Sequence, residues 1–78
     1  MVETALKTFD FTLILQGLDF DQQADRDRLF EAGCVDAVLG IRSGWSFAAF
    51  DREARSYAEA LLSAAEDVQA AGSRVYAI

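Results

Sequence analysis

The sequence predicts an α+β fold in which a four-stranded antiparallel sheet carries two helices on one face. Two observations predict it. The chain has 78 residues, which suffices for a single domain. Two helix-forming stretches, residues 22–32 and 56–71, alternate with β-prone stretches in the order strand, helix, strand, strand, helix, strand. This order is typical of the ferredoxin-like split βαβ fold, and right-handed crossovers place its first and third strands in the centre of the sheet.

The first strand is expected at residues 9–16, where apolar and polar side chains alternate. One set is Phe9, Phe11, Leu13 and Leu15, and the other is Asp10, Thr12, Ile14 and Gln16. Successive side chains of a strand point to opposite faces. The first set therefore predicts a core face beneath the helices. The second set is expected on an open sheet face, which is a candidate contact surface.

The first helix is expected at residues 22–32 and ends at Gly33, because glycine readily takes the left-handed conformation that stops a helix. Asp19 or Asp21 is expected to cap its first turn by accepting a backbone hydrogen bond. Its apolar stripe is narrow and consists of Ala24, Leu29, Phe30 and Ala32.

A β-hairpin is predicted next, from strands at residues 34–41 and 45–50 around the turn Arg42-Ser43-Gly44. In the first of these strands one face is expected to carry Val35, Ala37, Leu39 and Ile41. Residues 51–55 are expected to form a charged connection to the second helix.

The second helix has the clearest pattern in the chain. Ser56 and Glu59 have the spacing of a capping box. The apolar face is expected to consist of Tyr57, Leu61, Ala64, Ala65, Val68 and Ala71. Gly72 closes the helix, and residues 74–78 predict the last strand.

The composition argues against several classes of function. A net charge of −6 disfavours direct binding of nucleic acid, which requires a basic patch, and fits either a basic protein partner or simple solubility. The chain has no histidine and a single cysteine, Cys34, which is expected to pack as a small core residue. Isolated glycines make no phosphate-binding loop. We therefore expect no catalytic residue, no metal and no cofactor, and a protein that is not an enzyme.

The location is expected to be cytoplasmic, because no apolar run is long enough to span a membrane and no signal peptide is evident. The apolar fraction of 53% is high for so small a domain. This suggests that some apolar surface is buried against a partner or in a homodimer.

Two further surfaces are candidates for contact with a partner. The first, called the acidic edge, surrounds the first helix and consists of Asp19, Asp21, Asp25, Asp27, Glu31 and Asp36. Its simpler interpretation is a solvated helix face. The second is the hairpin, where Arg42 and Trp45 are residue types common at interfaces. Its simpler interpretation is that Trp45 folds back over the sheet.

Three segments carry a resemblance to a known group of proteins. They are residues 29–37 (LFEAGCVDA), residues 50–54 (FDREA) and the helix from Ala58 to Gly72. Together they resemble the N-terminal accessory domain of small bacterial DNA-binding or antitoxin-like proteins. In that family a helix-turn-helix follows the last strand, whereas this sequence ends at Ile78, so the resemblance implies dimerisation or protein contact. In size and charge the chain is also similar to phage-encoded anti-CRISPR inhibitors.

The sequence thus predicts a non-enzymatic, acidic protein-binding module. The expected role is that of an inhibitor, anti-CRISPR-like or antitoxin-like, whose partner is a protein with a basic or nucleic-acid-binding surface. The alternative is a regulatory or dimerisation domain of a bacterial transcription regulator, with a small effector as a candidate ligand.

Overall fold

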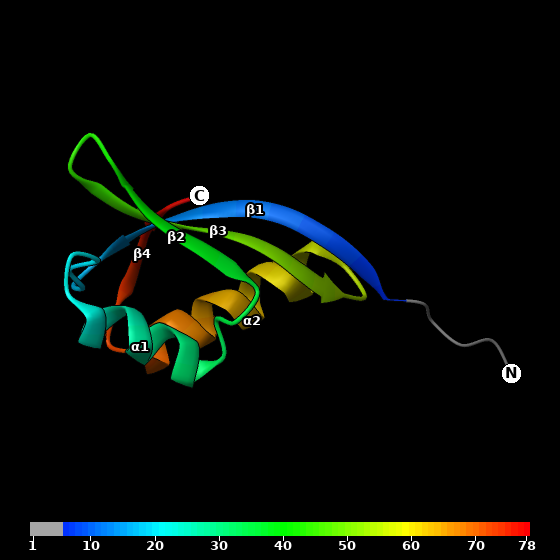
Figure 1. Ribbon diagram of the computed structural model, residues 1–78. Helices are drawn as coiled ribbons and strands as arrows, with labels where there is room; N and C mark the ends of the chain where they lie inside the picture. The colour runs from blue at the N-terminus through cyan, green and yellow to red at the C-terminus, as the bar shows by residue number, and fades with distance from the viewer. Residues whose placement is uncertain (1–5) are drawn as a thin grey trace, which may run out of the picture.

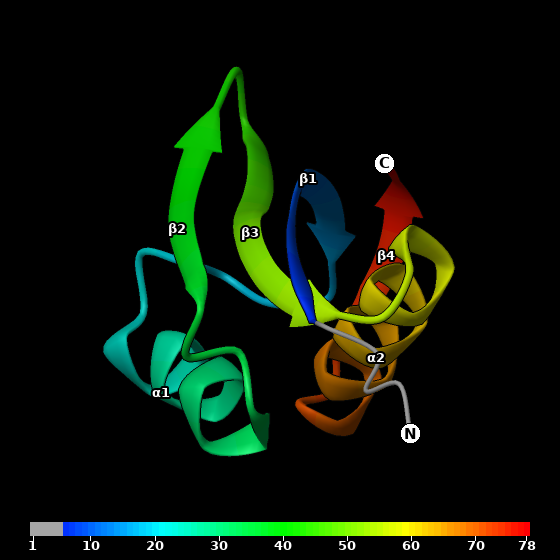
Figure 2. The same cartoon turned by 90° about the vertical axis from the view of Figure 1, so that its right-hand side faces the viewer.

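The four strands form one antiparallel sheet, and both helices lie on the same face of it (Figure 1). The computed structural model describes residues 6–78. The elements are β1 (Lys7–Gln16), α1 (Gln23–Ala32), β2 (Ala37–Arg42), β3 (Trp45–Ala54), α2 (Tyr57–Ala70) and β4 (Arg74–Ala77). The strand order is β2-β3-β1-β4, with α1 on the β2 side and α2 on the β4 side (Figure 2). The predicted ferredoxin-like fold is confirmed.

The central strand β1 supplies much of the core, as its alternation predicts. Phe11, Leu13 and Leu15 are buried, and Phe9 is half-buried. The Phe11 ring stacks on Phe50 of β3, with ring centroids 5.4 Å apart. The alternate residues of β1 lie on the opposite face, away from both helices. The division of β1 into a core face and an open face is therefore confirmed.

The second strand begins later than predicted, at Ala37 instead of residue 34. Gly33 ends α1 in the left-handed conformation, and the backbone N–H of Cys34 then donates to the carbonyl of Leu29 at 2.9 Å. Cys34 thus belongs to the helix end and not to the sheet. Its burial as a small core residue is confirmed. Val35, expected on the strand, lies in the connection and is 76% exposed.

The stretch predicted as a charged connection is instead the second half of β3. This strand runs to Ala54 because it pairs with β1 over nearly its full length, from Lys7↔Ala54 to Leu15↔Ser46. Arg52 is buried on the core face, whereas Asp51 and Glu53 are exposed on the open face. The charged side chains at positions 51–53 thus point alternately to the open face and to the core, as side chains of a strand do.

The hairpin between β2 and β3 has a two-residue turn. Ser43 and Gly44 both have positive φ, at 52° and 79°, and Arg42 pairs directly with Trp45. A turn of this kind matches the right-handed twist of the strands that it joins. The hairpin rises away from the helix layer (Figure 2).

The first helix is held to the core by one side chain. Leu29 is fully buried, whereas Phe30 is 40% exposed and Ala24 is exposed. The N-cap residue is Gln22, and its side chain makes no capping hydrogen bond. The predicted capping by Asp19 or Asp21 is therefore wrong.

The second helix packs through small side chains. Ala60, Ala64 and Val68 are fully buried, and Ala60 is the member that the predicted face omits. Ser56 is the N-cap, and its hydroxyl accepts a hydrogen bond from the Glu59 N–H at 3.2 Å. The Glu59 carboxylate accepts from the N–H of Arg55 and not from that of Ser56, so only half of the predicted capping box forms.

Candidate functional site

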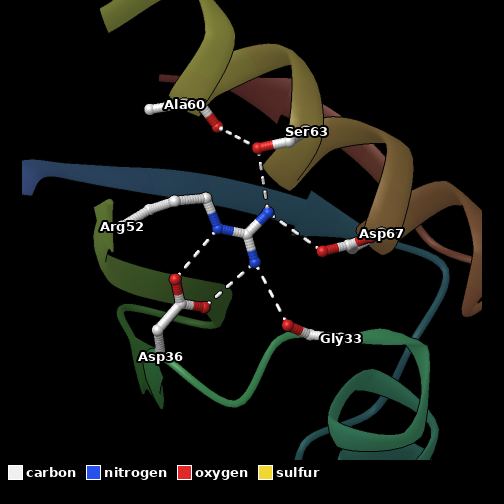
Figure 3. A network of polar contacts seen from close by, with 6 residues as sticks. All are labelled: Gly33, Asp36, Arg52, Ala60, Ser63 and Asp67. Carbon is white, nitrogen blue, oxygen red and sulfur yellow. Dashed lines mark hydrogen bonds and ion pairs between the residues drawn. The ribbon is translucent and has the colours of Figure 1, made fainter. Parts of the chain in front are cut away.

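A buried arginine is one of two features that could carry function. Arg52 is 8% exposed and lies between the end of α1, the start of β2 and α2 (Figure 3). Its guanidinium makes a two-point contact with Asp36, through Nε at 2.9 Å and Nη2 at 3.0 Å. Nη1 lies 2.9 Å from the Asp67 carboxylate and donates to Ser63, while Nη2 also donates to the Gly33 carbonyl at 3.1 Å.

The charged groups of this cluster are paired with one another, Arg52 with Asp36 and with Asp67. The hydrogen bond from Arg52 lowers the pKa of Asp36 below its ordinary 3.8, and the same bond raises the pKa of Arg52. Burial, followed by the nearby Asp67 carboxylate, raises the pKa of the Cys34 thiol to about 11. A thiol with this pKa stays protonated at neutral pH and is a poor nucleophile. Every buried side-chain nitrogen or oxygen in residues 6–78 has a hydrogen-bond partner. We therefore interpret the cluster as a clamp between the two layers.

The open sheet face is the second feature and the stronger candidate. No element within residues 6–78 covers it. Its described residues are Asp10, Thr12, Ile14 and Gln16 of β1, Trp45, Phe47, Ala49, Asp51 and Glu53 of β3, Val38, Gly40 and Arg42 of β2, and Arg74 and Tyr76 of β4. Part of this face is hollowed into a cup of about 690 Å³.

The wall of the cup is an aromatic pair. The Trp45 and Tyr76 rings stack with centroids 4.8 Å apart and an interplanar angle of 26°. They come from β3 and β4, which lie on either side of β1, so the pair spans the face of the central strand. Trp45 nevertheless stays 44% exposed and Tyr76 58% exposed. Large aromatic side chains that remain this exposed on one face are typical of contact surfaces.

The floor of the cup depends on a glycine. Gly40 lies opposite Phe47 in the β2–β3 ladder, and a Cβ atom at Gly40 would come within 2.5 Å of the Phe47 ring. The Phe47 ring therefore occupies the space over β2 that a side chain at position 40 would fill. The Arg42 guanidinium carbon lies 5.9 Å from the centroid of the same ring. The hairpin residues Arg42 and Trp45 and the β1 residues Thr12 and Ile14 thus line one hollow.

The two ends of the open face carry opposite charges. Arg42 and Arg74 are exposed at the end near the cup. At the other end Asp10 and Asp51 are directly paired across β1 and β3, and both are exposed. Like charges placed opposite one another in a sheet are unfavourable. The hydrogen bond and the repulsion from Asp10 raise the pKa of Asp51 above its ordinary 3.8.

We expect Asp51→Asn to stabilise the fold at pH 7, because the amide can donate to Asp10 and the repulsion is lost. The raised pKa means that the folded chain holds this proton more tightly than the unfolded chain does. The stability of the wild type should then fall as the pH rises from 3.8 through the raised pKa of Asp51. Thermal unfolding of both proteins across this pH range should show the advantage of Asp51→Asn vanishing in acid. Glu53→Gln is the matched control, because Glu53 pairs with the uncharged Thr8. An equal gain from Glu53→Gln would contradict the explanation.

The acidic edge is only partly available as a surface. Asp36 is engaged with Arg52, and the Asp25 carboxylate accepts a hydrogen bond from the N–H of Asp19 at 2.8 Å. Asp19 in turn accepts from the N–H of Asp21 at 3.0 Å. Asp21, Asp27 and Glu31 are exposed, so the outer side of α1 keeps a smaller negative surface.

No protein-family model, curated protein or solved structure matches the chain. None of the helices within residues 6–78 is long and apolar enough to cross a membrane. In the same part of the chain no three side chains of the metal-binding types come together as a metal site. The candidate site therefore rests on geometry alone.

The sequence indicates some of the open face and misses the rest. The two predicted surfaces meet in part: Thr12 and Ile14 of β1 line one cup with Arg42 and Trp45 of the hairpin. Asp10 and Gln16 lie on the same face but do not line the cup. Sequence reasoning missed Phe47 and Tyr76 as lining residues, and Gly40 as the position that leaves room for the Phe47 ring. Phe47 lies two residues after Trp45, and this spacing within a strand already indicates that both share a face.

Proposed function

We propose that this chain is a non-enzymatic protein-binding module and that its open sheet face is the contact surface. One observation carries the proposal. A sheet face bearing Trp45, Tyr76, Phe47 and Ile14 is left uncovered by residues 6–78, and its two aromatic wall residues are about half exposed. Exposed apolar patches rimmed by charged residues are typical of protein interaction sites. The cup offers space for apolar side chains of a partner.

The charge of the chain supports a partner with a basic surface. A net charge of −6 repels nucleic acid but attracts proteins that bind it. We therefore propose that the partner is a nucleic-acid-handling protein. The role is that of a small cytoplasmic inhibitor, antitoxin-like or anti-CRISPR-like, which competes for or blocks such a basic surface.

The dimensions of the cup also favour one alternative. A hollow of about 690 Å³ falls within the range of small-molecule sites, roughly 300–1,000 Å³. This supports a regulatory or dimerisation domain that binds a small effector. An effector that fills the cup would raise the unfolding temperature, and the rise would continue with the logarithm of the effector concentration above its Kd. Such a response would favour the alternative over the inhibitor.

We expect the purified chain to bind at least one member of a panel of nucleases and nucleic-acid-binding regulators in biolayer interferometry. Replacing both Trp45 and Tyr76 by Ala should weaken this binding about 30-fold or more, because a central aromatic anchor is worth about 2 kcal/mol or more. Phe30→Ala is the matched control, since it removes an aromatic side chain of similar exposure from the helix side. It should leave the affinity within about twofold.

Two results would contradict the proposal. Binding to no member of the panel would rule out the partner class. Binding that survives the double aromatic replacement but fails in Asp27→Arg, Glu31→Arg would move the contact surface to the acidic edge. Asp25 is left unchanged in that variant because its carboxylate holds the connection before α1.

A further inference from the structure

The two ends of the open face differ in the sign of their charge. Arg42 and Arg74 lie at one end, and Asp10, Asp51 and Glu53 lie at the other. The carboxylates of Asp10 and Asp51 lie opposite each other, and neither makes a salt bridge within residues 6–78. This is an arrangement that a pair of positive charges brought from outside would relieve.

The sizes of the side chains between the two ends also alternate. Next to the basic end lies a row of large side chains, Ile14 and Phe47, which are paired across β1 and β3. The following row, towards the acidic end, consists of the small pair Thr12 and Ala49. Trp45 and Asp51 are six residues apart on β3, which corresponds to about 20 Å. The midpoint of that distance lies between the large row and the small row.

A two-fold axis through this midpoint makes the face complementary to itself. We place this axis between two facing sheets, parallel to them and perpendicular to the strands. Each residue at one end of the face then lies opposite the other end of the face of the second copy. The basic end of one copy then meets the acidic end of its partner, and the large row of each copy meets the small row of the other. A two-fold interface requires this kind of self-complementary patch.

We propose that a second copy of this chain covers the open sheet face in a two-fold dimer, with the arginines of each copy against the aspartates of the other. The inference rests on the proposed use of this face for protein contact and names the partner that occupies it in the free protein. A nucleic-acid-handling partner that binds at the same face must displace the second copy. The footprint of four strands over six residues is roughly 400 Å² in plan, which belongs to the class of weak, transient interfaces.

Charge reversal tests the dimer together with its register. One variant carries Arg42→Glu and Arg74→Glu, and the other carries Asp10→Arg and Asp51→Arg. We expect the wild type to associate in sedimentation velocity between about 1 µM and 1 mM, the range of weak affinities. Each variant alone should be monomeric, because it places like charges together. An equal mixture of the two should regain the dimer mass, because every reversed end then meets its opposite.

The control is Asp27→Arg with Glu66→Arg, which reverses two exposed carboxylates on the helix side and should leave dimerisation unchanged. A wild type that is monomeric at 1 mM, or variants that each dimerise as well as the wild type, would overturn the proposal. Circular dichroism of each variant establishes folding. If a double variant unfolds, the two single variants Arg42→Glu and Asp51→Arg can be mixed in its place, and the same outcomes are expected.

The outcomes separate this inference from the proposed function. A wild-type monomer whose binding to a nucleic-acid-handling protein still depends on Trp45 and Tyr76 would refute the dimer alone. A dimer with the expected charge-reversal behaviour, and no binding to any protein of the panel, would refute the inhibitor role alone.

Discussion

Replacing Arg52 by Met is expected to lower the free energy of unfolding by about 3 kcal/mol at pH 7. The substitution leaves the carboxylates of Asp36 and Asp67 without their cation and removes a donor from the carbonyl of Gly33. Removing one partner of a buried ion pair costs about 3–5 kcal/mol, and the lower end applies because the carboxylates are 28% and 31% exposed. The total stability of a domain of this size is only about 4–12 kcal/mol.

The measurement is urea denaturation followed by circular dichroism, in which the midpoint should fall while the slope stays constant. Arg55→Met is the matched control, because Arg55 is exposed, and it should change stability by less than about 0.5 kcal/mol. Arg52→Lys should lie between the two, since it keeps the charge but not the two-point contact with Asp36. A loss in Arg52→Met no larger than in the control would show that the clamp contributes nothing.

The same variant should change the response of the fold to acid. The Arg52 hydrogen bond lowers the pKa of Asp36, so its contribution to stability is present above pH 3.8 and is lost as the pH falls through the lowered pKa. Without Arg52 the pKa of Asp36 returns towards its ordinary value. The acid-induced loss of stability that this carboxyl causes should therefore be smaller in Arg52→Met than in the wild type.

Replacing Leu29 by Ala is expected to cost about 3 kcal/mol, within the range of about 2–5 kcal/mol for buried leucines. Leu29 is fully buried and is the single buried residue of α1. The loss should be unevenly distributed. Without this anchor α1 should exchange its amide hydrogens well before α2 and the sheet, because regions held by few buried contacts open locally.

Hydrogen exchange detected by mass spectrometry measures this difference. Val68→Ala is the comparison, since Val68 is equally buried but lies on α2 with two further buried residues, Ala60 and Ala64. It should lower protection across the domain rather than in one helix. Uniform loss of protection in Leu29→Ala would show that α1 is held by contacts other than Leu29.

The sequence predicts the fold correctly because its periodic patterns show which side chains are buried, and burial of apolar surface is the main force that stabilises a fold. The alternation in β1 and the apolar face of α2 each specify which side is buried, and burial of those sides determines the architecture. The prediction of a connection at residues 51–54 is wrong, because charged residues alone do not distinguish a connection from a strand. A strand residue can carry a charge into the interior when partners surround it, and the partners of Arg52 come from residues 16 positions earlier and 15 later in the chain.

The candidate site is less predictable because it depends on register. That Trp45 stacks on Tyr76 follows from the position of β4 beside β1, which no local pattern encodes. The pairing of Asp10 with Asp51 depends likewise on the alignment of two strands. The failed capping by Asp19 has a local cause, because its carboxylate accepts a hydrogen bond from the N–H of Asp21 in the connection before α1.

The alternation of β1 and β3 has a consequence for how the protein can evolve. On each strand the odd and even positions are under different selection. One set packs in the core and maintains the folded state, and the other set lies on the open face and contacts only solvent or a partner. Arg52, Phe50 and Leu13 are constrained by the interior, whereas Trp45, Phe47 and Thr12 lie on the open face. Changes at the open positions can therefore accumulate at low cost in stability. A small domain arranged in this way can acquire new partners while its scaffold stays the same, and randomising those positions in the laboratory would sample the same freedom.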